Sequence, residues 1–287
     1  MTVLARSPST YITQRSSPGG SRVGPIVLAL VGSAAIFLLG TPYFEIFEAT
    51  NDDPYFNGAL ALGAGVLAWT LRHRNDAYSA VSSALFVTAA AMWSLVIGPF
   101  NWLITADPDT IDEAFQDKLA QFLAIVPVVL LVAWLVGRSR ESLYLVRGNS
   151  SRWLRVGVPS LVSWAALMTL IAVADGASVD AVFELAPWAI GFAVLNAAME
   201  ELWFRGISLQ PYLKHLGAPV AIGLTAFIFG LAHVEATYMS DATQLPFAFL
   251  VLGLGAVLAW IMHWSNSIWG AVLFHTGMGL IVIFDYL

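Results

Sequence analysis

Residues 118–137 read KLAQFLAIVPVVLLVAWLVG, a run in which Lys118 is the only charged residue. About 20 mostly apolar residues are enough for a helix to cross the hydrocarbon core of a bilayer. Eight further apolar runs occupy residues 23–39, 55–71, 79–104, 153–174, 181–204, 217–235, 244–263 and 267–286. The run at 55–71 is the weakest, because it is short and rich in Gly and Ala. The sequence therefore predicts eight or nine membrane spans.

The composition also argues against a water-facing shell. Of 287 residues, 58% are hydrophobic and 11% are charged, and the mean hydropathy is +0.75. A soluble domain of average composition has about 25% charged residues. In lipid, backbone polar groups must pair within the protein, so only helices and closed barrels span a membrane. The apolar runs are continuous rather than alternating, which favours helices. We expect an all-α, polytopic transmembrane helical bundle.

The charges of the loops predict the orientation of this bundle. Basic residues of short loops collect on the cytoplasmic side of a membrane. When the loops are assigned alternately to the two sides, one side holds 12 of the 13 Lys and Arg residues, and only Lys118 lies on the other. The twelve are Arg6, Arg15, Arg22, Arg72, Arg74, Arg138, Arg140, Arg147, Arg152, Arg155, Arg205 and Lys214. This alternation predicts a cytoplasmic N-terminus.

The same features predict where the protein resides and how it is organised. We expect an integral, multi-pass protein of the plasma (inner) membrane, in contact with the lipid bilayer and with no nucleic-acid partner. Residues 1–22 are basic and rich in Ser and Pro, which indicates a disordered cytoplasmic tail. The helices of residues 23–180 have no assigned role. The absence of cysteine excludes disulfides, thiolate metal sites and a cysteine nucleophile.

Three clusters of polar residues interrupt the apolar runs of the last hundred residues. They read EELWFRG at 200–206, FGLAH at 229–233 and HTGMG at 275–279. Ionisable residues inside or beside membrane spans are costly and mark functional sites by default. These clusters are therefore the first candidates for a site.

Helical geometry separates the two adjacent glutamates of the first cluster. Neighbours on a helix lie 100° apart, so Glu200 and Glu201 face different directions. Glu201 and Arg205 form an i, i+4 pair with the acid first, which is the favourable order. Glu201 is therefore the candidate for a structural ion pair, and Glu200 for a reactive carboxylate. Asn196 lies one turn before Glu200 on the same face.

The spacing of the clusters predicts that they converge. If the spans at 181–204 and 217–235 form a hairpin that turns near residues 216–217, Glu200 and His233 lie at similar depth. His275 lies about nine residues into the last span, or ~13 Å along it. One buried polar pocket then holds all three.

A carboxylate and two imidazoles in such a pocket favour hydrolysis. Glu200 would act as the general base on a water molecule that His233 holds beside it. His275 would donate to the oxyanion of the transition state. Taken singly, each has a structural reading: Glu201 and Arg205 form a common interfacial anchor, and a lone His233 beside Phe229 is more often a packing residue.

This ordered pattern resembles the family of CAAX prenyl proteases and bacteriocin-processing enzymes, also called the abortive-infection family. The resemblance covers residues 181–287. It implies an all-helical intramembrane endopeptidase of the glutamic type, acting on a membrane protein or lipid-anchored peptide without a cofactor. It also implies Glu200 as the base, His233 as its partner and His275 in the oxyanion site. Glu201, Arg205, Phe229 and Asn196 would be supporting residues.

One residue departs from the family pattern. The third motif of the family is commonly His-x-x-x-Asn or His-x-x-x-Asp, whereas position 279 is Gly. Glycine supplies no donor, and removing one oxyanion donor typically lowers a rate ~10²- to 10³-fold. Either the protein is slow, or another group such as Asn196 substitutes, or the chain is a binding protein on a protease scaffold.

Three other readings stay open at this level. A non-catalytic scaffold or immunity factor would need no donor at Gly279. A proton-coupled transporter would also use intramembrane carboxylates, although the first half of the chain has no intramembrane acid of this kind. Within the enzyme class, Glu200, His233 and His275 are also a possible three-ligand zinc site.

Overall fold

The computed structural model describes residues 21–40, 53–74, 76–103, 108–234 and 241–287, and the expected tail at 1–22 lies almost wholly outside them. Across these ranges the secondary structure is helical, with no strand, which confirms the all-α class. The helices are α1 (Val23–Gly40), α2 (Pro54–Leu71), α3 (Ala77–Ile97), η2 (Asn101–Leu103), α4 (Ile111–Leu135), α5 (Ser150–Ala174), α6 (Val179–Glu200), η3 (Glu201–Gly206), α7 (Leu209–Leu216), α8 (Ala218–Leu231), α9 (Asp241–Ser265), α10 (Trp269–Gly279) and η4 (Leu280–Tyr286).

Many of these helices are apolar enough to lie in a membrane. Five stretches within the described residues have the length and hydropathy of a complete span: Ala77–Ile97, Ile111–Leu135, Ser150–Ala174, Val179–Leu216 and Pro246–Ser265. Three shorter apolar helices accompany them, at Val23–Leu39, Ala218–Leu231 and Trp269–Phe284. The chain is an integral membrane protein, while the count of eight or nine spans stays a prediction.

The connection between α6 and α8 differs from the expected simple hairpin. The π-helical turn η3 follows α6 directly, and the short helix α7 intervenes before α8. Gly217, at φ +89°, lies in the left-handed region and separates α7 from α8. His233, expected inside a span, lies in the turn after α8, where its backbone N–H donates to the Gly230 carbonyl at 3.1 Å. A longer connection therefore joins the first two clusters.

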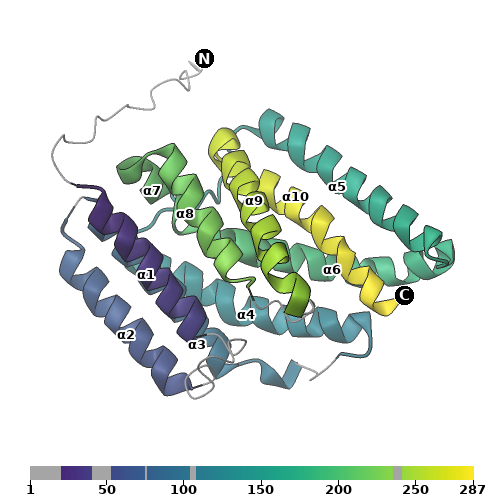
Figure 1. Ribbon diagram of the computed structural model, residues 1–287, viewed down its shortest axis with the longest axis horizontal. Coiled ribbons are helices and arrows are strands. Elements are labelled where there is room, and N and C mark those ends of the chain that lie inside the picture. The colour runs from purple at the N-terminus through teal and green to yellow at the C-terminus, as the bar shows by residue number, and fades with distance from the viewer. Residues whose placement is uncertain (1–20, 41–52, 75, 104–107, 235–240) are drawn as a thin grey trace, which may run out of the picture.

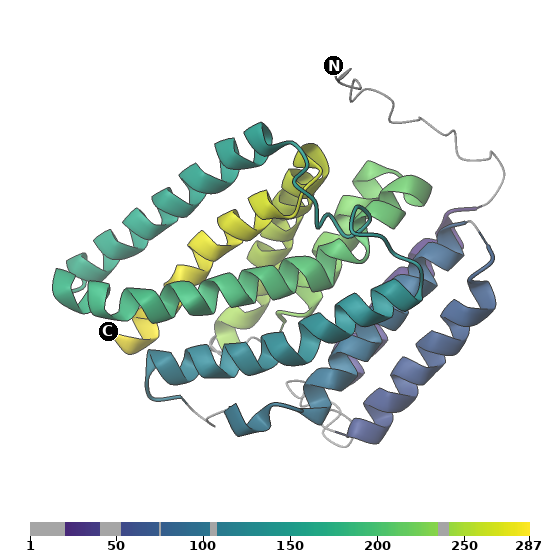
Figure 2. The same ribbon diagram turned by 180° about the vertical axis from the view of Figure 1, so that it is seen from behind.

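The helices pack in an order that brings distant segments together. In Figures 1 and 2, α6 runs between α4 and α10, and α10 lies between α6 and α5. On the other side of α4, α3 packs against α1 and α2, and α8 pairs with α9. The segment after α6, the end of α8 and the middle of α10 consequently belong to neighbouring helices.

Glycines let α10 approach its two neighbours closely. A Cβ atom at Gly279 would lie 3.1 Å from the Cβ atom of Ala193 on α6. A Cβ atom at Gly277 would lie 3.0 Å from the Cβ atom of Trp164 on α5. Small residues permit such close helix contacts in membranes, where packing rather than water drives association. Glycine therefore places α10 tightly between α5 and α6.

The loop before α5 holds the turn from which α10 starts. The backbone N–H of Asn149 donates to the Ser265 carbonyl at 2.8 Å, and that of Ile268 donates to the Tyr144 carbonyl at 3.1 Å. The Ser267 hydroxyl donates to the Val146 carbonyl at 2.8 Å. These bonds fix the α9–α10 turn against a loop more than 100 residues away in sequence.

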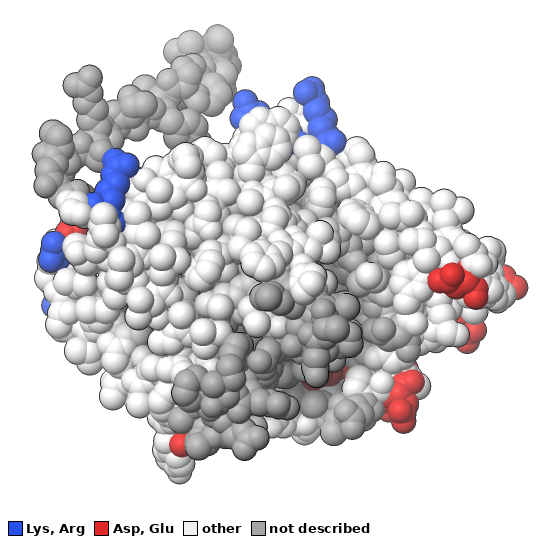
Figure 3. Space-filling view, in the orientation of Figure 1, with Lys and Arg blue, Asp and Glu red and all other residues white. Residues whose placement is uncertain are grey.

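Charged side chains separate toward the edges of the molecule. Figure 3 shows Lys and Arg along the upper and left edges and most Asp and Glu along the right and lower edges, with an uncharged surface between them. Asp76 is an acidic residue that does not follow this separation, because its carboxylate forms an ion pair with the basic residue Arg74 at 2.8 Å. This separation of basic from acidic side chains agrees with the alternation of loop charges in the sequence.

Replacing Gly148 by Ala tests the loop that holds the α9–α10 turn. Gly148 has φ +53°, and its new Cβ atom would overlap the carbonyl oxygens of Asn266 and Ser265. Gly137 has φ +79° but nothing within 4 Å, so Gly137→Ala is the matched control. A left-handed non-glycine residue costs about 1–2 kcal/mol. We expect Gly148→Ala to lower the thermal unfolding midpoint in detergent more than Gly137→Ala does. Equal midpoints for the two variants would contradict the described packing.

Candidate active site

A buried ion pair lies at the centre of the candidate site. Glu201 and Arg205, both in η3, are 0% exposed, and Arg205 Nη1 lies 2.8 Å from Glu201 Oε1. The turn is π-helical because the Ile207 backbone N–H donates to the carbonyl of Leu202, five residues earlier, at 3.2 Å. Single π turns often occur at functional sites. The predicted i, i+4 pair is present, inside a wider turn than expected.

The Arg205 side chain is held from two further helices. Its guanidinium carbon lies 4.1 Å from the centre of the Phe229 ring on α8, within cation–π range. Its Nε donates to the Gly255 carbonyl on α9 at 3.4 Å. A Cβ atom at Gly255 would lie 3.2 Å from Arg205 Nη2, so glycine there leaves room for the guanidinium. Arg205 thus links η3, α8 and α9.

His275 of α10 lies between the two glutamates. Its Nδ1 is 2.9 Å from Glu201 Oε1, and its Nε2 is 3.5 Å from Glu200 Oε2. A carboxylate paired with arginine accepts hydrogen bonds and does not donate them. Nδ1 therefore bears the hydrogen that Glu201 accepts, and Nε2 bears a second hydrogen only when the ring is cationic. Both glutamates, expected to face apart, contact one imidazole.

His233, in the turn after α8, is the second histidine near Glu200. Its Nδ1 lies 2.8 Å from the Phe229 carbonyl oxygen, which can only accept a hydrogen bond. In the neutral ring, Nε2 is consequently the unprotonated acceptor. This Nε2 lies 4.0 Å from Glu200 Oε1. The turn after α8 therefore directs a free acceptor toward the Glu200 carboxylate.

Phe229 packs against both imidazoles. Its ring centre lies 4.5 Å from that of His233 and 5.8 Å from that of His275, each in an edge-to-face arrangement. The Phe229 side chain is 1% exposed. Edge-to-face contacts between aromatic rings add about 0.5–1.5 kcal/mol beyond burial. One aromatic ring thus supports the guanidinium and both histidines.

The structure brings together most, but not all, of the predicted site residues. Glu200 is 13% exposed by side chain and has both histidines within 4.0 Å. Asn196 is partly buried and makes no hydrogen bond with a described residue. Lys118 of α4, absent from the predicted set, interacts electrostatically with Glu200. Its only signal in the sequence was its position on the side opposite the other twelve basic residues.

Several buried polar atoms of the site lack hydrogen-bond partners among the described residues. They are Glu200 Oε2, Glu201 Oε2, Trp203 Nε1, Arg205 Nη2 and Thr276 Oγ1. Most buried polar atoms in native proteins have a partner, from protein or from ordered water. The cluster therefore has unused capacity to bind water or a polar part of a substrate.

The donor atoms do not form a metal-binding set. Across the ranges that the structure describes, no group of three or more His, Asp or Glu side chains has the arrangement needed to hold a metal ion. Glu201 Oε1, which contacts His275, is already paired with Arg205. The zinc reading of Glu200, His233 and His275 gains no geometric support.

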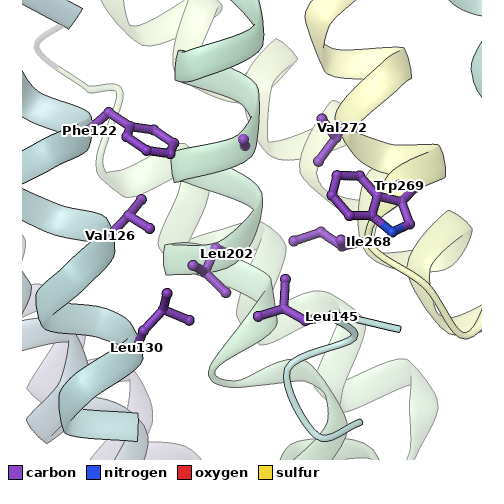
Figure 4. Close-up of a pocket in the computed structure, with 9 residues that line it drawn as sticks. Phe122, Val126, Leu130, Leu145, Leu202, Ile268, Trp269 and Val272 are labelled. Carbon is purple, nitrogen blue, oxygen red and sulfur yellow. The ribbon is translucent and has the colours of Figure 1, made fainter. Parts of the chain in front are cut away.

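An apolar pocket lies beside the polar cluster. Figure 4 shows it between α4, the end of α6 and the start of α10, with a cavity volume of about 150 Å³. Its lining residues are Phe122, Val126, Leu130, Leu145, Ala198, Leu202, Ile268, Trp269 and Val272. Leu202 belongs to the same η3 turn as Glu201 and Arg205. The η3 turn therefore contributes Glu201 to the buried ion pair and the adjacent Leu202 to the apolar pocket.

Comparison with known families gives one match. Residues 182–281 match the family described as Type II CAAX prenyl endopeptidase Rce1-like. No curated protein and no solved structure matches the chain. The matched range contains all three polar clusters and begins one residue after the expected start at 181. The segment that holds the candidate site, residues 182–281, is thus similar to the Rce1-like CAAX prenyl endopeptidase family, in agreement with the resemblance of its motifs.

Proposed function

We propose that this protein is an intramembrane endopeptidase that hydrolyses a membrane-associated peptide or protein with a water molecule activated by Glu200. One observation carries the proposal. Two imidazole Nε2 atoms lie 3.5 and 4.0 Å from the Glu200 carboxylate, and hydrogen bonds hold the other nitrogen of each ring. The family match supports protease chemistry for the same segment.

The distance between Glu200 and His233 suits a shared water molecule. A polar contact longer than about 3.5 Å often has a water between its two groups. Glu200 Oε1 and His233 Nε2, 4.0 Å apart, are both acceptors when the ring is neutral. A water between them would donate one hydrogen to each, which leaves a lone pair directed at a substrate carbonyl. Glu200 would take the proton as the water attacks and pass it to the leaving amine.

His275 would stabilise the negative charge that forms on the carbonyl oxygen. Its Nδ1 bonds to Glu201 Oε1, which fixes the orientation of the ring, and Arg205 balances the charge of Glu201. When the ring also carries a hydrogen at Nε2, that N–H is a donor. A donor held in place before the reaction contributes more than one that must reorient. The ion pair would therefore position the oxyanion donor.

Gly279 supplies no side-chain donor at the position where the family pattern has Asn or Asp, so the site holds one oxyanion donor fewer unless another residue replaces it. A Cβ atom at this position would lie 3.1 Å from that of Ala193, so the Asn or Asp of the family pattern would require α6 and α10 to move apart by a few tenths of an ångström. Asn196, one turn before Glu200 on α6, is the proposed substitute. If no substitute acts, the second candidate function is a non-catalytic scaffold or immunity factor, which Gly279 favours. That protein would keep its cellular phenotype in Glu200→Gln and His275→Ala variants.

The proposed setting is a multi-pass protein of the plasma (inner) membrane with its N-terminus in the cytoplasm. The separation of basic and acidic side chains in Figure 3 supports a single orientation. The proposed substrate is a membrane protein or a lipid-anchored peptide. The apolar lining of the pocket beside η3 supports a substrate with a hydrocarbon portion.

Replacing Glu200 by Gln tests the proposed base. The amide keeps the shape of the side chain but cannot accept a proton from water. We expect peptide cleavage in detergent to fall ~10²- to 10⁴-fold, the usual contribution of general acid–base catalysis. The exposed Glu184, also on α6, provides the control Glu184→Gln, which should cleave at the wild-type rate. Cleavage by Glu200→Gln at the rate of Glu184→Gln would refute Glu200 as the base.

Replacing Arg205 by Met tests the buried ion pair. The variant leaves the Glu201 charge buried without its partner, and breaking a buried pair in this way costs about 3–5 kcal/mol. We expect a large loss of thermal stability in detergent micelles. The double variant Glu201→Gln/Arg205→Met removes both charges and should recover part of that loss. Equal stability of the single and double variants would show that the pair does not hold the site.

Chelation tests the metal-free character of the reaction. Because the described donors form no metal-binding set, we expect cleavage to persist after dialysis against a chelator, with no metal found in the active protein. Magnesium-saturated chelator serves as the control for effects of the chelator on the detergent. Loss of cleavage that added zinc restores would replace the proposed mechanism with a metal-dependent one.

A further inference from the structure

The apolar pocket beside η3 opens at the surface of the helical bundle. Two of its lining residues, Leu130 of α4 and Trp269 of α10, are 39% and 45% exposed, whereas Leu202 of η3 is buried. An apolar cavity of similar size stays dry, because a buried water needs polar partners, but it binds benzene. The pocket, of about 150 Å³, therefore fits a segment of a hydrocarbon chain that enters from the bilayer.

The loop between α4 and α5 forms one end of this pocket. In Figure 4, Leu145 of that loop lies next to the residues from which α10 starts. The Ser267 hydroxyl donates to the Val146 carbonyl at 2.8 Å, and the Trp153 indole N–H donates to the Arg147 carbonyl at 2.9 Å. These bonds hold the backbone of Arg147 at this end of the pocket, two residues after Leu145.

The same end of the pocket is strongly basic. Residues 138–155 contain five arginines and a single acidic residue, Glu141. Arg138 donates to a serine of α3, and Arg152 donates to a carbonyl at the end of α9 at 2.7 Å. Arg147 is exposed, and its guanidinium forms neither an ion pair nor a hydrogen bond with a described residue. All five of its N–H donors are therefore available to a ligand.

The mouth of the pocket matches the depth of lipid headgroups. Trp269 at the mouth is 45% exposed, and Trp134 at the end of α4 is 69% exposed. Tryptophan is enriched at membrane–water interfaces. Figure 3 shows basic side chains along the upper edge, where α5 begins and α9 ends in Figure 1. In the proposed orientation this edge faces the cytoplasm, and the cytoplasmic leaflet is the one with anionic lipids.

We propose that the pocket binds an acyl chain of an anionic phospholipid from the cytoplasmic leaflet, with the lipid phosphate at Arg147. This inference goes beyond the proposed function, which concerns peptide hydrolysis. The apolar lining selects a hydrocarbon chain, and a guanidinium selects phosphate because it donates two parallel hydrogen bonds to it. A hydrocarbon portion of a substrate would share the lining but would not need Arg147.

A lipid chain in the pocket contacts both elements that hold the candidate site. Leu202 follows Glu201 in η3, and Val272 lies three residues before His275 on α10. A chain between these helices supplies van der Waals contacts that an empty pocket lacks. The lipid therefore stabilises the packing of η3 on α10, on which the bond between Glu201 and His275 depends.

General attraction of lipid to a basic surface makes a different prediction. One basic residue near an anionic surface contributes roughly fivefold to affinity, wherever it lies on that surface. Arg72, at the end of α2, is exposed, and α2 contributes no residue to the pocket. Under general attraction, Arg72→Gln and Arg147→Gln weaken lipid binding equally. A site at the pocket makes binding depend on Arg147 alone.

The experiment measures lipid binding to delipidated, full-length protein in detergent by native mass spectrometry. The probes are dioleoyl-phosphatidylglycerol and dioleoyl-phosphatidylcholine, which have the same chains and differ in net charge. Arg147→Gln removes the guanidinium, and Arg147→Lys keeps a charge there. Val126→Phe fills the pocket from α4. Leu131→Phe is its matched control, because Leu131 lies on the same helix but is 55% exposed and outside the pocket lining.

We expect one phosphatidylglycerol to bind the wild type, and its affinity to fall about 10- to 100-fold in Arg147→Gln, the usual effect of losing a hydrogen bond to a charged group. Val126→Phe should lose binding to a similar extent, because the chain has no space. Arg147→Lys should keep most of the affinity, and Leu131→Phe and Arg72→Gln should match the wild type. Phosphatidylcholine should bind the wild type as weakly as phosphatidylglycerol binds Arg147→Gln. Bound phosphatidylglycerol should also raise the thermal unfolding midpoint of the wild type.

Three results would overturn the lipid site. Equal weakening by Arg147→Gln and Arg72→Gln shows general attraction instead. Equal affinity of Val126→Phe and Leu131→Phe places the chain elsewhere; if Val126→Phe does not fold, Leu130→Phe at the exposed mouth makes the same comparison. An uncharged N-palmitoyl peptide that binds as tightly as phosphatidylglycerol, with no loss in Arg147→Gln, assigns the pocket to a substrate chain. None of these measurements uses cleavage, so they decide the lipid site whether or not the protein is an endopeptidase.

Discussion

The arrangement of the site depends on a buried ion pair between two residues of one helical turn. Glu201 and Arg205 are fully buried, and each also contacts another helix: Glu201 bonds to His275 on α10, and Arg205 packs on Phe229 of α8. Phe229 then supports His233 through its ring and its carbonyl group. A buried charge without its partner is strongly unfavourable, so the pair enforces one arrangement of three helices. Glu200, the residue before Glu201, lies within 4.0 Å of both imidazoles.

Close helix packing supplies the other half of this geometry. His275 reaches the glutamates because α10 lies tightly between α5 and α6, with Gly277 facing one neighbour and Gly279 the other. The departure at position 279 from the family pattern follows from the same contact, because a larger residue there would meet Ala193. Glycine at this position favours close packing of α6 and α10 and supplies no donor side chain. We propose that a group elsewhere, such as Asn196, supplies the missing donor.

The features that could be predicted from the sequence are those set by a local pattern of residues. Apolar runs located the helices, and the spacing of Glu201 and Arg205 located their ion pair, because both follow from the helical period. The π-helical turn, helix α7 and the bond between Glu201 and His275 were not predicted, since they arise from contacts between helices that no local period encodes. Lys118 was visible only as an exception to the charge pattern. Its position beside Phe192 of α6 requires the packing of α4 on α6, which the sequence alone does not specify.

In the proposed reaction, Glu200 activates a water molecule rather than attacking the peptide itself. A single turnover in ¹⁸O-labelled water, with enzyme in excess over peptide, tests this most directly. If water attacks the carbonyl carbon, every new product carboxylate contains one ¹⁸O atom from the first turnover onward, by mass spectrometry. If Glu200 attacks and an anhydride forms, the first product can contain an unlabelled oxygen from the Glu200 carboxylate. We expect full labelling in the first turnover; unlabelled product formed in that turnover would show that Glu200 attacks the peptide directly.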